Sequence, residues 1–152
     1  MKSPKVGDVF EIATTKGKAF FQYVLNKPDT GQLIRILPGL YNDTNNLEEL
    51  VKGNELFFVY FPLKAAYKQG ILKHLGNYDV PKSFKPPRYM RSKSVDKDGN
   101  LIKWHIVDTE TWHREPVSEL SNDQKKLSPW GIWNDSLLIE RLSNGWNLDK
   151  WV

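Results

Sequence analysis

Residues 7–25 read GDVFEIATTKGKAFFQYVL, and this stretch determines the class of fold that we expect. Large apolar side chains alternate with smaller or polar ones over residues 9–13, which is the two-residue period of a β-strand. Residues 14–17 are typical of a turn that ends in glycine, and residues 19–25 form a second apolar run. The stretch therefore predicts a β-hairpin.

Three further segments extend this hairpin into a sheet. Residues 33–37 (LIRIL) stop at a Pro-Gly pair and predict a third strand. Residues 56–61 (LFFVYF) are apolar at every position, so we expect a central strand that is buried on both faces. Residues 63–69 predict a helical turn that leads into a strand near residues 71–75.

Capping residues predict the helices. Asn45 and Glu48 have the spacing of a capping box, in which each side chain satisfies a free backbone N–H, and they predict a short central helix. Ser121 and Gln124 repeat this spacing. Asn134 is a good N-cap for a C-terminal helix that ends at an Asn-Gly pair.

Together these elements predict an α+β fold. We expect a bent antiparallel sheet that is partly barrel-like, with a short central helix and a C-terminal helix. The length of 152 residues favours a single domain over residues 1–152. Prolines at positions 81, 86 and 87 interrupt regular structure, so we expect an irregular basic loop at about residues 76–97.

The composition indicates a cytoplasmic protein. The chain has no cysteine, which excludes disulfides and thiolate chemistry and fits a reducing compartment. Residues 1–30 lack the apolar region of a secretory signal. The longest apolar run, residues 56–61, is far shorter than the roughly 20 residues of a membrane span. We therefore expect no association with a membrane.

The residues that catalysis needs do not cluster in the sequence. There is no Gly-x-Ser-x-Gly motif and no glycine-rich phosphate loop, and the three histidines are His74, His105 and His113. A hairpin over residues 101–114 that is symmetric about Thr109 would place His105 opposite His113. This pairing leaves open a small hydrolase, or a metal site completed by a carboxylate. We predict no catalytic residue, no metal and no cofactor, and hence no enzyme.

Positive charge is concentrated in residues 82–97, although the net charge of the whole chain is only +4. Phe84 and Tyr89 are interleaved there with six basic residues: Lys82, Lys85, Arg88, Arg91, Lys93 and Lys97. Basic groups beside aromatic rings bind phosphates and stack on bases, which predicts, as one alternative, a nucleic-acid-binding regulatory protein. A solvated loop that two aromatic rings pin to the core is the other reading. The same charges would also steer an acidic protein partner.

The six tryptophans all follow residue 103. We expect most of them in the core, where the hairpin of residues 101–114 meets the C-terminal helix. Tryptophan is also enriched in binding hot spots, and Trp130 and Trp151 lie near a turn and near the chain end. The predicted partner-binding residues are Lys82, Phe84, Lys85, Arg88, Tyr89, Arg91, Lys93, Trp130 and Trp151.

The N-terminal hairpin resembles a known family. Residues 5–12 (KVGDVFEI) and 17–24 (GKAFFQYV) are similar to the opening of the immunity protein 26 family, with weaker similarity over residues 33–39 and 57–63. Members of that family are antidotes in bacterial polymorphic toxin systems. The resemblance therefore implies a non-catalytic inhibitor that binds a toxin effector and neutralises it. Our leading prediction is a protein-binding module of this immunity type.

Overall fold

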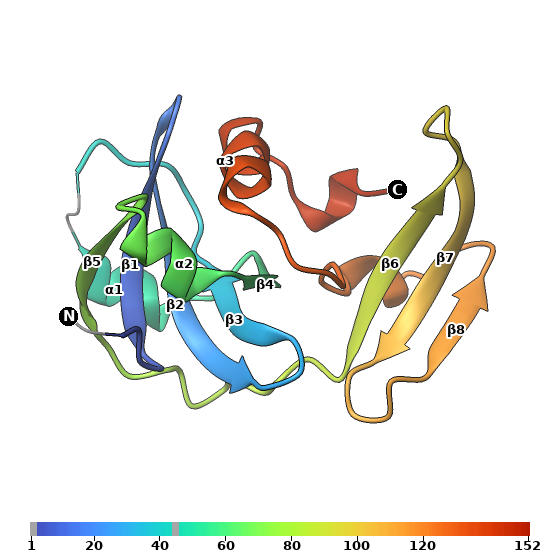
Figure 1. The fold of residues 1–152 in the computed structure, drawn as a ribbon, viewed down its shortest axis with the longest axis horizontal. Coiled ribbons are helices and arrows are strands. Elements are labelled where there is room, and N and C mark those ends of the chain that lie inside the picture. Colours follow the sequence, from blue (N-terminus) through green and yellow to red (C-terminus); the bar gives the residue numbers. More distant parts are fainter. Residues whose placement is uncertain (1–2, 44–45) are drawn as a thin grey trace.

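The protein folds into two antiparallel sheets with helices packed between and beside them (Figure 1). The computed structural model describes residues 3–43 and 46–152. The predicted α+β class is confirmed, and the described strands form two open sheets that close no barrel. The C-terminal part of the chain lies between the two sheets (Figure 1).

The larger sheet has five strands in the order β4-β3-β2-β1-β5. The predicted N-terminal hairpin is confirmed: Phe10 pairs with Phe21, and Thr14 pairs with Gly17 at the turn. Gly17 has φ +135°, an angle that a residue with a β-carbon rarely adopts. The strands are β1 (Asp8–Thr14), β2 (Gly17–Lys27), β3 (Gly31–Ile36), β4 (Phe57–Phe61) and β5 (Leu72–Asn77).

Strand β4 is buried as predicted, but it lies at the edge of the sheet, so the prediction of a central strand is wrong. A non-local segment, residues 128–133, covers its free edge. Tyr60 forms an isolated bridge with Ile132, and the Phe58 N–H donates to Ser128 Oγ at 2.9 Å. An edge strand can therefore be apolar throughout, because another part of the chain shields it.

Two of the three predicted capping sites are confirmed. The Leu137 N–H donates to Asn134 Oδ1 at 2.8 Å, which confirms Asn134 as the cap of α3. Ser121 and Gln124 form the predicted reciprocal box, with bonds of 2.9 and 3.1 Å. The predicted cap at Asn45 lies outside the described residues. The helices are α1 (Leu47–Lys52), α2 (Leu63–Lys68) and α3 (Asp135–Ser143), with the 3₁₀ helices η1 (Gln124–Lys126) and η2 (Leu148–Lys150).

The smaller sheet has the order β6-β7-β8, with β6 (Tyr89–Val95), β7 (Leu101–Asp108) and β8 (Arg114–Val117). The predicted pairing of His105 with His113 is wrong, because His105 pairs with Pro116. The Asp108 carboxylate accepts the N–H groups of Glu110 (2.9 Å) and Thr111 (3.2 Å), which makes the turn longer than a hairpin centred on Thr109. This longer turn shifts the register and separates the two imidazoles.

The main core lies between the five-stranded sheet, α2 and α3. Trp133 and Trp146 pack against Phe57 of β4 at ring-centroid distances of 5.5 and 5.1 Å, so these tryptophans lie on the five-stranded sheet and not, as predicted, where the hairpin of residues 101–114 meets the C-terminal helix. A second apolar cluster covers the other face of the sheet, where Phe20 and Val51 meet beside α1. The five-stranded sheet is therefore buried by apolar side chains on both faces.

Candidate functional site

The basic segment is more ordered than predicted. Residues 78–88 are irregular, Tyr89–Val95 form strand β6, and residues 96–97 begin the next turn, so the prediction of a continuous irregular loop over residues 76–97 is wrong. The prolines confine the irregular part, since all three precede residue 88. Beyond them the side chains alternate between the two faces of a strand, and this alternation decides which of the basic groups reach solvent.

Arg91 is fully buried, so it is not the exposed partner-binding residue that we predict from sequence. Its guanidinium donates to four backbone carbonyls, those of Lys125 (2.9 Å), Leu127 (3.0 Å), Leu148 (2.8 Å) and Trp151 (2.7 Å). The rings of Trp104 and Trp151 lie 5.1 and 4.7 Å from it. Burial lowers the pKa of Arg91 to about 10, which leaves it charged at neutral pH. Arg91 thus ties the C-terminal segments to β6.

The other basic side chains do not form one positive surface. Lys93 Nζ donates to the carbonyl of Val152 at 2.8 Å, and the Arg88 guanidinium forms ion pairs with Asp108 (3.2 Å) and Glu110 (3.5 Å). Lys82 and Lys85 are exposed in the irregular segment, whereas Lys97 lies in the turn between β6 and β7. The structure therefore separates the charges that the sequence places together.

The predicted partner-binding aromatics differ in exposure. Phe84 is half-buried and packs on Phe58 at a centroid distance of 5.6 Å, so it pins the irregular segment to the core. Trp130 and Trp151 are also half-buried, against Tyr60 (5.8 Å) and Trp104 (5.0 Å) respectively. Tyr89 is 45% exposed. Of these four predicted aromatics, Tyr89 is the one that a partner can reach most easily.

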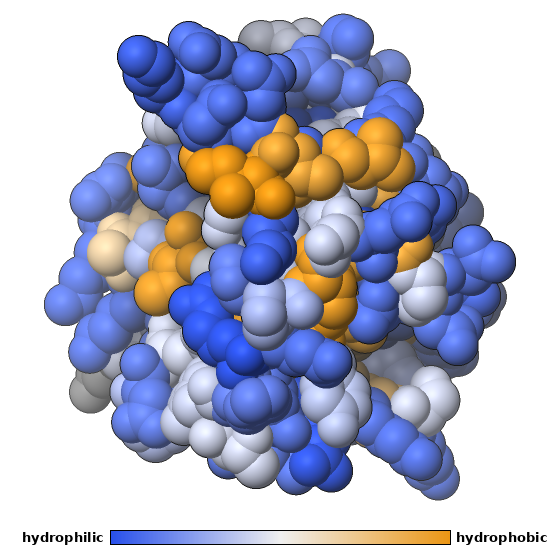
Figure 2. Space-filling view, turned by 90° about the vertical axis from the view of Figure 1, so that its right-hand side faces the viewer, coloured by the Kyte–Doolittle hydropathy of each residue, from blue (hydrophilic) through white to orange (hydrophobic). Residues whose placement is uncertain are grey.

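The three-stranded sheet also carries exposed apolar side chains that the sequence analysis did not single out. Val95, Leu101 and Ile102 lie at the far end of the β6–β7 hairpin, and Ile102 is 62% exposed. Val95 pairs directly with Leu101, so these two side chains are neighbours on one face of the sheet, whereas Ile102 points to the opposite face. Figure 2 shows a band of hydrophobic surface on this side of the molecule. Trp112, in the β7–β8 turn, is 39% exposed.

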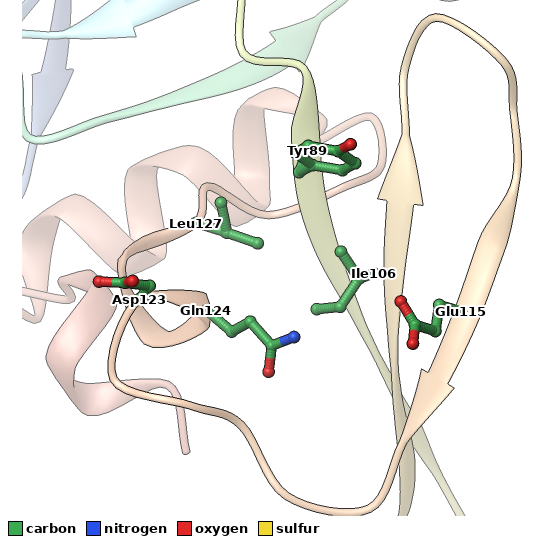
Figure 3. A pocket seen from close by; sticks show the side chains of 6 residues that line it. All are labelled: Tyr89, Ile106, Glu115, Asp123, Gln124 and Leu127. Carbon is green, nitrogen blue, oxygen red and sulfur yellow. The ribbon is translucent and has the colours of Figure 1, made fainter.

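A pocket of about 330 Å³ lies between this sheet and η1 (Figure 3). Ile106 and Leu127 form its apolar part, and Tyr89 closes one end. Glu115 of β8 and Gln124 of η1 reach into the pocket from opposite sides, whereas the Asp123 carboxylate points away from it (Figure 3). The pocket therefore combines an apolar wall, an aromatic ring, a carboxylate and an amide, which is the mixture typical of binding sites.

Two features described above fix the wall of this pocket. The Arg91 guanidinium holds the carbonyls of Lys125 and Leu127, and Leu127 belongs to the wall. The N–H of Ser121 donates to Gln124 Oε1, so the remaining amide nitrogen of Gln124 is left for a ligand. Arg91, predicted as a binding residue, instead positions a residue that lines the pocket.

Sequence reasoning missed Ile106, Glu115, Gln124 and Leu127 as site residues. The capping-box spacing of Ser121 and Gln124 predicts where the Gln124 side chain lies, so the sequence contained an indication for this one residue. The position of Glu115 depends on the β7–β8 register, in which it pairs with Ile106. That register follows from the turn around Asp108, which a symmetric hairpin does not predict.

Sequence reasoning also missed a polar pair on the other sheet. His74 Nε2 lies 3.1 Å from Asp8 Oδ1, because β5 pairs with β1 across a long stretch of chain. Asp8 also accepts from the Lys5 N–H (2.7 Å) and from Asn77 Nδ2 (3.0 Å). Burial raises the pKa of Asp8, but these hydrogen bonds outweigh burial and hold the pKa below its ordinary value. The pair anchors β5 at the sheet edge.

The described residues contain neither a metal-binding cluster nor a membrane-spanning helix. Within residues 3–43 and 46–152, no three His, Asp or Glu side chains are placed to hold a metal ion. In the same part of the chain, no helix has both the length and the apolar character to cross a bilayer.

Comparisons with protein-family models, with curated proteins and with solved structures find no match to this chain.

Proposed function

We propose that this protein is a non-catalytic binding module that inhibits a bacterial toxin by covering it with the surface of the three-stranded sheet. The observation that carries the proposal is the exposed apolar and aromatic surface of this sheet, beside a pocket that Glu115 lines. Tyr89, Trp112 and Ile102 are 45%, 39% and 62% exposed. Tyr89 and Trp112 lie at one end of the sheet and Ile102 at the other. Large exposed side chains of this kind are typical of interfaces.

The choice of a toxin as partner rests on the resemblance of residues 5–25 to the immunity protein 26 family. These residues form the β1–β2 hairpin at the middle of the five-stranded sheet, and they supply its core. They are therefore expected to define a scaffold, while the three-stranded sheet supplies the binding surface. Localisation in the bacterial cytoplasm follows from the same proposal.

The alternative of a nucleic-acid-binding protein loses its main support. That reading needs the basic side chains of residues 82–97 on one surface, where they would displace counterions together. Arg91 is buried, Arg88 is paired with Asp108, and Lys93 contacts the Val152 carbonyl. We therefore favour a protein partner.

A growth-rescue assay tests the proposal. The partner is first captured from the native host with the tagged protein, identified by mass spectrometry, and then expressed in a heterologous bacterium, where it should arrest growth. Coexpression of this protein should restore growth. Ile102→Asp should abolish the rescue because it puts a charge into the apolar surface.

Val6→Asp is the matched control, since Val6 is 48% exposed near the other sheet. It should rescue as well as the wild type. A partner whose toxicity is unaffected by coexpression, or an equal loss of rescue in both variants, would refute the proposal.

A further inference from the structure

We propose that the pocket of Figure 3 receives one arginine side chain from the partner protein, with its guanidinium on Glu115. The inference rests on the proposed function, because it assigns the arginine to the partner. The proposed function gives a role to the exposed apolar surface of the three-stranded sheet, and this inference adds a role for the pocket beside it.

The first argument is the charge of Glu115, which is an exposed residue. Its carboxylate reaches into the pocket (Figure 3), and it has no ion pair or hydrogen bond within the described part of the chain. Two arginines of the same sheet are already engaged: Arg91 is held by four carbonyls, and Arg88 by Asp108 and Glu110. The carboxylate is therefore accessible to a cation from outside the chain.

The second argument is the shape of the pocket. Ile106 and Leu127 provide an apolar wall that suits the aliphatic part of a long basic side chain. A pocket of about 330 Å³ lies at the small end of ligand sites, which fits one side chain better than a cofactor. The pocket thus offers carbon contacts and a negative charge to one long basic side chain.

The third argument separates arginine from lysine. A guanidinium is planar, so it can pack on an aromatic ring, as Arg88 does at 5.4 Å from the centroid of the Tyr89 ring, and still present two N–H groups to a carboxylate. An ammonium group lacks this fork. Lys125 and Lys126 lie on η1 near the pocket but do not line it, so they do not fill the position.

A titration monitored by NMR tests the inference without any partner. The probes are N-acetyl-arginine amide and its neutral isostere, N-acetyl-citrulline amide, added to the ¹⁵N-labelled protein. The arginine probe should shift the signals of Glu115, Gln124 and Tyr89, and the citrulline probe should bind roughly three- to tenfold more weakly. Glu115→Gln should remove this difference, whereas Glu119→Gln, an exposed acid outside the pocket, should retain it.

Three outcomes overturn the inference. The first is equal binding of the two probes, the second is tighter binding of N-acetyl-lysine amide, and the third is an absence of shifts at the pocket. A further test uses the captured partner. If Glu115→Gln binds it as tightly as Glu119→Gln does, the partner does not use the pocket, while the proposed inhibitory function can still stand. Failure of the growth rescue with a positive titration would refute the function instead.

Discussion

The five-stranded sheet is buried on both faces by apolar side chains, whereas the three-stranded sheet is organised around one buried guanidinium. On the first, aromatic and aliphatic residues from the sheet, α2 and α3 form a continuous core. On the second, the apolar cluster is smaller, and Arg91 is the side chain on which two segments of backbone converge, residues 125–127 and 148–151. A small sheet has little apolar area to bury, so charge-assisted hydrogen bonds replace part of it.

A buried arginine is present in each sheet, and the comparison between the two is informative. Arg35 of β3 donates to Gln22 Oε1 at 2.8 Å and lies 3.5 Å from Glu55, so side chains supply part of its environment. Arg91 donates to carbonyls alone among its described hydrogen bonds. Arg35 therefore reinforces a core that apolar contacts already define, while Arg91 assembles its region.

Removing Arg91 should have the largest effect on stability. Arg91→Ala leaves four partly buried carbonyls without this donor and removes the cation from between two tryptophan rings, so we expect a loss of about 3–5 kcal/mol in the free energy of unfolding. Urea denaturation followed by tryptophan fluorescence measures it. Lys93→Ala, which removes one exposed bond to Val152, should cost much less. Similar losses in the two variants would contradict the role given to Arg91.

The Asp8–His74 pair should make the five-stranded sheet sensitive to acid. The pKa of Asp8 is below its ordinary value in the folded protein, so its stabilising contribution is complete above about pH 4 and disappears as the pH falls through the folded-state pKa. Asp8→Asn should cost about 1–3 kcal/mol at neutral pH and should flatten the loss of stability below about pH 4. Unfolding free energies measured from pH 6 to acid, about the range in which carboxylates titrate, test this.

Asn77→Ala removes one of the hydrogen-bond donors to Asp8. It should reduce the fall in unfolding free energy below about pH 4, but by less than Asp8→Asn does. If the unfolding free energy of Asp8→Asn falls with pH in parallel with that of the wild type, another group causes the acid sensitivity.

The smallest expected effect concerns the cap of α3. Asn134→Ala removes the acceptor for the Leu137 N–H, and such a change typically costs about 1 kcal/mol. Thermal unfolding followed by circular dichroism provides the measurement. Asn134→Ser keeps an acceptor and should recover most of the loss, and a serine variant as unstable as the alanine variant would count against capping.

Local patterns predicted local structure well in this protein. The hairpin of β1 and β2, the capping box at Ser121 and the cap at Asn134 all depend on residues that are neighbours in sequence. The edge position of β4 was not predictable in the same way, because the segment that shields it lies far along the chain. The apolar character of a strand predicts that it is buried, but it does not predict which segment of the chain covers it.

The candidate site was harder to predict for a related reason. Arg91 belongs to a run of basic residues, and its burial depends on carbonyls from distant segments. Glu115 reaches the pocket only because the Asp108 turn sets the register of β8. Tyr89 was identified correctly as an aromatic in the basic segment, and it is exposed beside the pocket. Charge density in a sequence therefore says little about which charges reach the surface.

One short segment closes both sheets. Residues 128–133 bridge β4 through Ile132 and bridge β6 through Pro129, so the same strip of backbone shields an edge of each sheet. While the ribosome is still synthesising the chain, those two edges have no cover, and each is a template for pairing with another molecule. We therefore expect the nascent chain to depend on chaperones until this strip emerges, and nonsense mutations upstream of Ser128 to yield products that aggregate.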